Sequence, residues 1–278
     1  MIPAGEADRN CVERARQGDW AAVAELIDPF RRPLFAYIYR MVTHRQDAED
    51  LMQDVFVRVM ESIGRYRGDG PFKSWLFGIA THVCLDRLRE KRRWRPEAQL
   101  IGEKEIDHDP EGLAQLRAVL SQPDFVFETR EHIAFCFACI GRTLPPEEQA
   151  ALLLREVLGF TAIEAAQILN VSEPVLRHRL AVGRAAMTEH YEGLCALINK
   201  NGRCYQCAGL RELSPEGHKG RALVQIEVRP GLAVTPENLL DARLDIVRQA
   251  DLENGATRPM HDLFFSNLSR REDALSSA

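Results

Sequence analysis

The sequence predicts an all-α protein of two helical domains joined by a linker, with a small α/β extension at the C-terminal end. Three patterns support this prediction. Apolar residues recur at three- and four-residue spacing through residues 48–63, as they do along one face of a helix. Two short helical segments on either side of Asn170-Val171-Ser172 have the pattern of a helix-turn-helix. Beyond about Gly193 the composition changes, and residues 222–228 have the apolar and β-branched character of a strand.

The first domain is expected to cover residues 1–95. Apolar residues at helical spacing mark two helices within residues 20–42, and the long helix at 48–63 follows them. Thr43 and Gln46 have the spacing of a capping box, in which both side chains satisfy backbone N–H groups at a helix start. These elements predict a compact helical domain.

A basic cluster follows the last helix of this domain. The Gly- and Pro-containing residues 64–71 break the chain, and the last helix then starts near Ser74. Six cations and one acid lie between Arg87 and Arg95, on a chain whose formal net charge is −5. The net charge argues against an unaided DNA-binding protein, but such a cluster suits a subunit that touches nucleic acid with part of its surface.

Residues 96–128 are rich in acids, Pro and Gly and predict a linker with one short helix near 113–120. The second domain, 129–192, contains a helix that Pro145-Pro146 opens and Gly159 ends.

Two caps define the helix-turn-helix of this domain. Thr161 and Glu164 have the spacing of a capping box, and Ser172 is placed to cap the following helix. Residues 193–278 form the C-terminal extension, with the strand at 222–228 and two helices around 239–247 and 260–268.

Composition excludes several classes of protein. No apolar run approaches the roughly 20 residues that span a bilayer, and the N-terminal residues lack the features of a signal peptide. We therefore expect a cytoplasmic protein with no membrane partner. There is no P-loop, no Gly-rich dinucleotide motif and no nucleophile-and-base signature, so we expect no enzyme activity.

Three segments of the first domain resemble region 2 of the extracytoplasmic-function (ECF) sigma factors. Residues 47–56 (DAEDLMQDVF) resemble the family's polymerase-binding helix, residues 72–80 (FKSWLFGIA) its promoter-melting segment, and residues 85–89 (LDRLR) its −10-reading helix. His82 departs from the family, which usually has Asn there. The polymerase-binding residues that the resemblance implies are Asp47, Glu49, Asp50, Gln53, Asp54 and Phe56. The DNA-binding residues that it implies here are Phe72, Lys73, Trp75, His82, Asp86, Arg87, Arg89, Arg92 and Arg93.

Physical chemistry gives each segment a second interpretation. Acids in the first turn of a helix favour its dipole, so Asp47 and its neighbours need no partner to explain them. Phe72 and Lys73, next to a Gly-rich loop, suit a pocket for an extruded base, whereas Trp75 is more typical of a core residue. The basic run suits contacts with successive phosphates.

Residues 144–187 resemble region 4 of the same family, which contacts the −35 element. In a helix-turn-helix the second helix enters the major groove, and Leu176 and Leu180 would pack inward. Arg177 suits a phosphate or a guanine equally well. Val182 and Gly183 stand where the family often has basic residues. The implied DNA-binding residues of this helix are Glu173, Val175, Arg177, His178 and Arg179.

The cysteines predict a metal site. Two cysteine pairs have the Cys-x-x-Cys spacing, Cys136/Cys139 and Cys204/Cys207. Together they could form a four-thiolate zinc site, structural or sensory. His132 and Cys195 are possible substitute ligands. A redox switch and simple burial are the alternatives. His132, Cys136 and Cys139 share a helical stripe about 100° from the apolar stripe of the same helix, so this stripe need not face the core of the second domain and leaves room for another segment to cover it.

The sequence is thus identified as a member of the ECF sigma factors. That resemblance implies a factor that binds core RNA polymerase and promoter DNA and directs transcription initiation, regulated through its cysteine-containing extension. The sequence leaves open whether a separate anti-sigma factor binds it. The alternative functions are a stand-alone helix-turn-helix regulator and a thiol oxidoreductase, which would need a β-α-β pattern that the sequence lacks.

Overall fold

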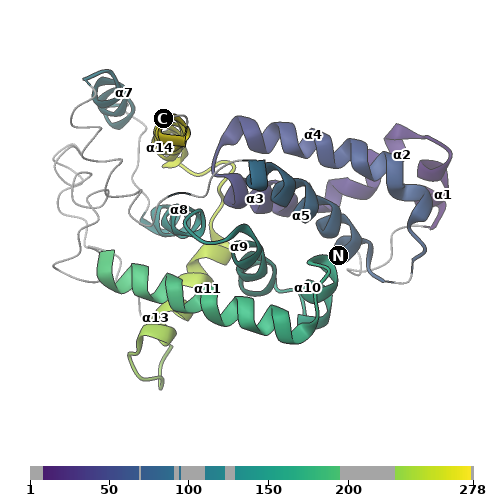
Figure 1. The fold of residues 1–278 in the computed structure, drawn as a ribbon. Coiled ribbons are helices and arrows are strands. Elements are labelled where there is room, and N and C mark those ends of the chain that lie inside the picture. Colours follow the sequence, from purple (N-terminus) through teal and green to yellow (C-terminus); the bar gives the residue numbers. More distant parts are fainter. Residues whose placement is uncertain are drawn as a thin grey trace. The chain divides into compact units, whose positions relative to one another are not determined.

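The computed structural model describes residues 9–68, 70–90, 94, 110–122, 129–194 and 229–276, and within these ranges every regular element is a helix (Figure 1). This confirms the predicted all-α class; the strand expected at 222–228 lies outside the described residues. None of the described helices is both long and apolar enough to cross a membrane. Contacts divide the chain into two units, one of Met1–Glu90 with Pro146–Leu180 and the other of Lys91–Pro145 with Ala181–Ala278. The domain boundaries expected from the sequence remain a prediction.

The first unit begins with a helical bundle. Its core is apolar and includes Leu34, Ile38, Leu51, Val55, Leu76 and Phe77, each at most 2% exposed. These residues follow the three-and-four spacing seen in the sequence, because that spacing places them on one face of each helix. The helices are α1 (Arg9–Arg16), α2 (Trp20–Ile27), η1 (Asp28–Phe30), α3 (Arg31–Val42), α4 (Arg45–Ser62), η2 (Ile63–Arg65) and α5 (Phe72–Glu90).

The junction between α3 and α4 differs from the sequence prediction. Thr43 has a left-handed backbone (φ 56°) and ends α3, with its N–H donating to the Tyr39 carbonyl at 2.7 Å. The N-cap of α4 is His44, whose Nδ1 accepts from the Asp47 N–H at 3.3 Å. The expected Thr43–Gln46 capping box is therefore wrong, because Thr43 already serves as the C-cap of the preceding helix.

The helix-turn-helix belongs to the same unit and is confirmed. It comprises α9 (Pro146–Leu152), a π-helical turn η3 (Leu153–Val157), α10 (Ala162–Ile168) and the start of α11 (Glu173–Leu194). Gly159 has φ +71°, which ends the first helix as predicted. The capping box of Thr161 and Glu164 has both of its hydrogen bonds. Buried Gln149 anchors α9 by donating from Nε2 to the carbonyls of Arg40 (2.8 Å) and Met41 (3.3 Å) at the end of α3.

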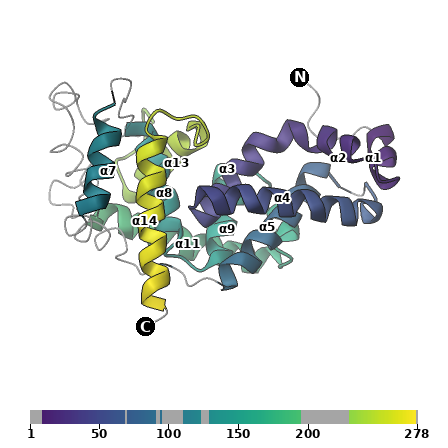
Figure 2. The same cartoon turned by 90° about the horizontal axis from the view of Figure 1, so that it is seen from above.

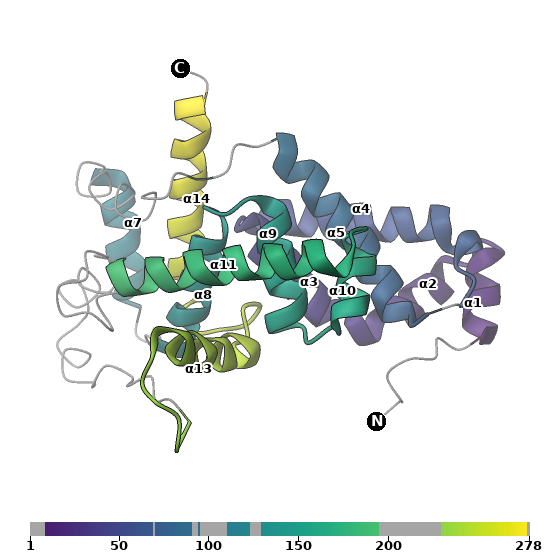
Figure 3. The ribbon, with the colours of Figure 1, turned by 60° about the horizontal axis from the view of Figure 1, so that its bottom comes forward.

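The second unit combines the linker helix, the first helix of the second predicted domain and the C-terminal extension. Its helices are α7 (Pro110–Leu120), α8 (Thr129–Gly141), α13 (Pro236–Gln249) and α14 (Arg258–Ser276), which confirms the short linker helix and both helices expected in the extension. Both α13 and α14 pack against α8, and α14 also lies beside α7 (Figures 2 and 3). The C-terminal part of α11 joins this unit, where Arg184 pairs with Asp241 at 2.7 Å.

Candidate nucleic-acid interface

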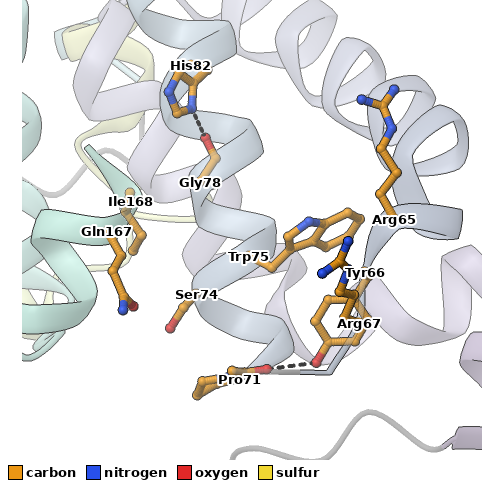
Figure 4. Close-up of a pocket in the computed structure, with 11 residues that line it drawn as sticks. Arg65, Tyr66, Arg67, Pro71, Ser74, Trp75, Gly78, His82, Gln167 and Ile168 are labelled. Carbon is orange, nitrogen blue, oxygen red and sulfur yellow. Dashed lines mark hydrogen bonds between the residues drawn. The ribbon is translucent and has the colours of Figure 1, made fainter. Parts of the chain in front are cut away.

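A cavity of about 350 Å³ lies at the start of α5 (Figure 4). The loop before α5 forms one side, where the Tyr66 hydroxyl donates to the Gly70 carbonyl at 2.9 Å and Gly68 has φ +79°. Arg65 and Arg67, on either side of Tyr66, bring positive charge to the rim. The complete lining is Arg65, Tyr66, Arg67, Gly70, Pro71, Ser74, Trp75, Gly78, His82, Gln167 and Ile168. The cavity therefore combines an aromatic wall with cations, which suits a nucleotide base and its phosphates.

The aromatic residues exchange the roles expected from the sequence. Phe72 is only 2% exposed and does not line the cavity, because its ring packs edge-on against Tyr66 at 5.5 Å. Trp75, which is more typical of a core residue, is half-buried and lines the cavity with its ring 5.2 Å from that of Tyr66. A base entering the cavity would thus meet Trp75 and Tyr66, and the buried Phe72 ring packs against both of these rings. The contact of these residues with DNA remains a prediction.

Helix α10 of the helix-turn-helix forms the opposite wall through Gln167 and Ile168 (Figure 4). The Ser74 hydroxyl donates to Glu164 Oε1 at 3.1 Å, and the Lys73 ammonium lies 4.5 Å from the centre of the Phe160 ring. His82 is exposed at the upper edge, where its Nδ1 donates to the Gly78 carbonyl at 2.7 Å.

The carboxylate of Glu164 is held in its charged form. Partial burial acts to raise its pKa, but hydrogen bonds from the Thr161 backbone and hydroxyl and from Ser74, together with the charge of Lys73, outweigh burial and lower the pKa. Glu164 Oε2 accepts from the Thr161 N–H at 2.9 Å and from its hydroxyl at 2.8 Å. An anion is therefore already present where Lys73 and Ser74 meet α10.

The end of α5 carries the residues expected to contact the −10 element. Asp86 and Arg89 are exposed and pair at 3.2 Å, whereas Arg87 is half-buried. Arg89 also pairs with Glu147 of α9 at 3.3 Å. Arg92 and Arg93 lie outside the described residues.

The recognition helix presents the expected surface. Leu176 is fully buried, and Glu173, Val175, Arg177 and His178 are exposed, while Arg179 is half-buried. The exposed residues point outward from the N-terminal half of α11, as base or phosphate contacts require.

Helix α4 carries the residues expected to bind polymerase. Gln53, Asp54 and Asp50 are exposed, and Asp50 accepts a hydrogen bond from Gln46 at 3.1 Å. Asp47 is half-buried near His44, and Glu49 pairs with Arg45 at 3.0 Å. Phe56 stacks on the exposed Trp20 ring at 6.3 Å, beside a hollow of about 390 Å³ between α2 and α4.

The expected zinc ligands are only partly within the described residues. Cys139 is buried and Cys136 is half-buried in α8, while Cys195, Cys204 and Cys207 lie outside. Over the described ranges, no three His, Cys, Asp or Glu side chains gather in a way that would hold a metal ion. The His132 ring is buried and lies against His261 of α14, with 3.2 Å between His132 Nδ1 and His261 Nε2.

Sequence reasoning missed several lining residues of the cavity. Arg65, Tyr66 and Arg67 could have been found, because cations interleaved with an aromatic residue beside a Gly-rich loop are typical of nucleic-acid contacts. Ser74 and Gln167 could not have been found from the sequence, because only the packing of α10 against α5 brings them to the same cavity.

Comparison with known proteins gives matches in both halves of the chain. The family profile for Sigma-70 region 2 matches residues 26–94, and that for Sigma-70, region 4 matches residues 136–187. The ECF RNA polymerase sigma factor SigG of Mycobacterium tuberculosis is 31% identical over 182 residues, which cover 62% of this chain and 48% of SigG. The chain thus spans about half the length of SigG. SigW of Bacillus subtilis, also an ECF RNA polymerase sigma factor, is 25% identical over 187 residues, which cover 66% of this chain and 96% of SigW.

Proposed function

Because the chain belongs to the ECF sigma factors, we propose that it binds core RNA polymerase in the cytoplasm, recognises promoter DNA and initiates transcription. The observation that carries the proposal is the cavity at the start of α5. It has an aromatic wall of Tyr66 and Trp75 and a cationic rim, and it lies in one unit with an exposed recognition helix. This combination suits a protein that holds an unpaired base and also contacts duplex DNA.

The proposed division of labour follows the exposed surfaces. Tyr66, Trp75 and His82 would receive an extruded base of the −10 element, and Arg87 and Arg89 would contact nearby phosphates. The exposed side chains of α11 would contact the −35 element in the major groove. On the polymerase side, the exposed carboxylates of Asp50 and Asp54 beside the apolar hollow at Phe56 suit a partner surface that is basic at its rim and apolar at its centre.

The C-terminal extension would regulate these activities. Its helices α13 and α14 pack on α8, so metal binding or thiol oxidation at the cysteines could alter that packing. Zinc bound by Cys136, Cys139, Cys204 and Cys207 is the form of regulation that the two cysteine pairs favour.

Run-off transcription with core polymerase tests the proposal. The templates are a pool of upstream genomic fragments, and the samples are core polymerase alone, with the full chain, and with a chain truncated after Tyr191. Transcripts that require the full chain support the proposal, and a difference between full and truncated chains supports regulation by the extension. Tight binding of duplex fragments without polymerase, together with no new transcripts, would instead indicate a stand-alone regulator.

A further inference from the structure

The contact between α10 and α5 places a carboxylate where a DNA backbone would pass. Glu164 Oε1 accepts from the Ser74 hydroxyl at 3.1 Å, and the charge of Lys73 acts on the same carboxylate. Hydroxyl and ammonium groups are also what proteins use to bind DNA phosphates. Because Ser74 lies on the lining of the cavity, the phosphates that flank a base in the cavity must pass close to it.

We propose that Lys73 and Ser74 form a binding site for a phosphate of the promoter strand, and that Glu164 occupies this site until DNA displaces it. The inference rests on the proposed promoter-binding function and adds to it an internal competitor for the same site.

Three further contacts show that α10 covers this part of α5. Gln167 and Ile168 close one wall of the cavity, so a base and α10 share its space. Phe160, directly before α10, packs its ring 5.3 Å from that of Phe77 and lies under the Lys73 ammonium at 4.5 Å. Lys73 is thereby held at the edge of α10 while Glu164 engages Ser74.

The contact is suited to reversible displacement. Glu164 is half-buried, and a single partly exposed polar contact contributes little to stability, so little free energy is lost when its carboxylate leaves Ser74 while α10 stays packed on α5. Glu164 also keeps its second role after displacement, because its other oxygen caps α10 through Thr161. The helix-turn-helix can therefore stay folded in both states.

The test measures binding of a fluorescein-labelled 15-nucleotide oligo(dT) to the full chain without polymerase, by fluorescence anisotropy at low salt. Glu164→Gln should bind about three- to tenfold more tightly than the unaltered chain, the range expected when one charge-assisted competitor is removed. Gln at this position keeps the capping box, so folding should be retained. Glu61→Gln, a carboxylate at an exposed position of α4, is the matched control and should bind like the unaltered chain.

A second set of variants makes the result decisive. Combining Glu164→Gln with Lys73→Ala and Ser74→Ala should abolish the gain, because the phosphate site is then absent. Glu164→Asp should give a smaller gain, since its shorter side chain retracts from Ser74, and it replaces the Gln variant if that one unfolds. Equal binding by the unaltered chain and both Glu164 variants would overturn the inference, as would a gain that persists without Lys73 and Ser74.

The run-off assay separates this inference from the proposed function. If the unaltered chain starts transcription with core polymerase and the Glu164 variants leave oligo(dT) binding unchanged, the internal competitor is refuted and the function stands. If no transcripts appear with any variant, the proposed function itself fails.

Discussion

The Nδ1 atom of His132 in α8 lies 3.2 Å from the Nε2 atom of His261 in α14, and both rings are buried. Phe135 stacks on His261 at 4.0 Å and on Phe265 at 3.9 Å, so the pair is enclosed by aromatic rings. Burial lowers the pKa of His132 to about 4, and burial together with the neighbouring His132 lowers the pKa of His261. The extension is thus joined to α8 by two neutral histidines.

This pair predicts that docking of the extension weakens as the pH falls. Each imidazole has a folded-state pKa below its ordinary value of 6.5, so the undocked chain binds more protons than the docked one. The contribution of each histidine to the docking free energy is fully present above pH 6.5. It falls toward pH 4, by up to about 1.4 kcal/mol per pH unit for each histidine. Hydrogen exchange of the α14 amides at pH 7.5 and 5.5, corrected for intrinsic rates, measures this loss of docking stability.

A variant assigns this effect to the histidines. His261→Gln keeps a hydrogen-bonding group beside His132 but has no proton that titrates in this range, so exchange should depend less on pH. His82→Gln, at an exposed histidine of α5, should keep the full dependence. Equal pH dependence in all three proteins would refute the role of the pair.

Glu131 of α8 makes a second contact that is expected to hold the extension in place. Its carboxylate accepts from the Ala256 N–H at 3.1 Å and from the Thr257 N–H at 2.8 Å, directly before α14. Glu131→Ala should destabilise the docked extension by about 1–2 kcal/mol, because two backbone donors lose a charged acceptor. The loss should appear as faster proteolysis of α14.

Gly255 offers an independent check of the same contact. A Cβ atom at this position would lie 2.7 Å from the Glu131 carboxyl group and 2.8 Å from the Asp251 carbonyl oxygen. Gly255→Ala should therefore also speed proteolysis, whereas Gly64→Ala, where a Cβ atom meets open space and the backbone is not left-handed either, should leave the proteolysis of α14 unchanged. Unchanged protection in the Glu131 and Gly255 variants would show that α14 is held elsewhere.

The exposed carboxylates of α4 predict loss of polymerase binding on charge reversal. Asp50→Arg with Asp54→Arg should abolish co-purification with core polymerase, because like charges would then face a basic partner. Circular dichroism should be unchanged, since both side chains are exposed. Glu61→Arg on the same helix is the control. Co-purification at the level of the unaltered chain would refute this docking surface.

The cations at the end of α5 predict a salt-dependent term in promoter binding. Arg87→Ala with Arg89→Ala should weaken binding of the polymerase complex to promoter DNA. It should also reduce the slope of log K against log salt by roughly 1 to 2, because fewer counterions leave the DNA when fewer phosphates are contacted. Glu147→Gln should act in the opposite direction, since it frees Arg89 from a pairing at 3.3 Å. An unchanged slope in the double variant would show that neither residue contacts phosphate.

The sequence predicts helices well where one local rule decides them. The capping box at Thr161 and the turn at Gly159 depend on neighbouring residues alone, and both are confirmed. The expected box at Thr43 failed because the same residue could end one helix or begin the next, and the left-handed backbone decides for the end of α3. Local spacing does not distinguish these two outcomes.

The candidate site was predicted in part, for a related reason. The Gly-rich loop beside Phe72 and Lys73 suggested a pocket there, and a cavity does lie at the start of α5, but the sequence did not decide which aromatic ring lines it. That depends on Tyr66 and on α10, which approach from other parts of the chain. Contacts such as Ser74 with Glu164, 90 positions apart, leave no periodic signal in the sequence.

The cysteine pairs predict one zinc ion per chain. Cys136 and Cys139 lie three positions apart in α8, and the pair at 204 and 207 would complete a four-thiolate shell. Elemental analysis of protein purified under reducing conditions without added metal should give about one zinc. Cys204→Ser should lose the metal and melt at a lower temperature, because metal binding contributes directly to folding. Cys84→Ala, at a buried thiol of the other unit, should keep its zinc. A zinc content near zero, with Cys204→Ser melting like the unaltered protein, would leave redox switching or simple burial as the role of these thiols.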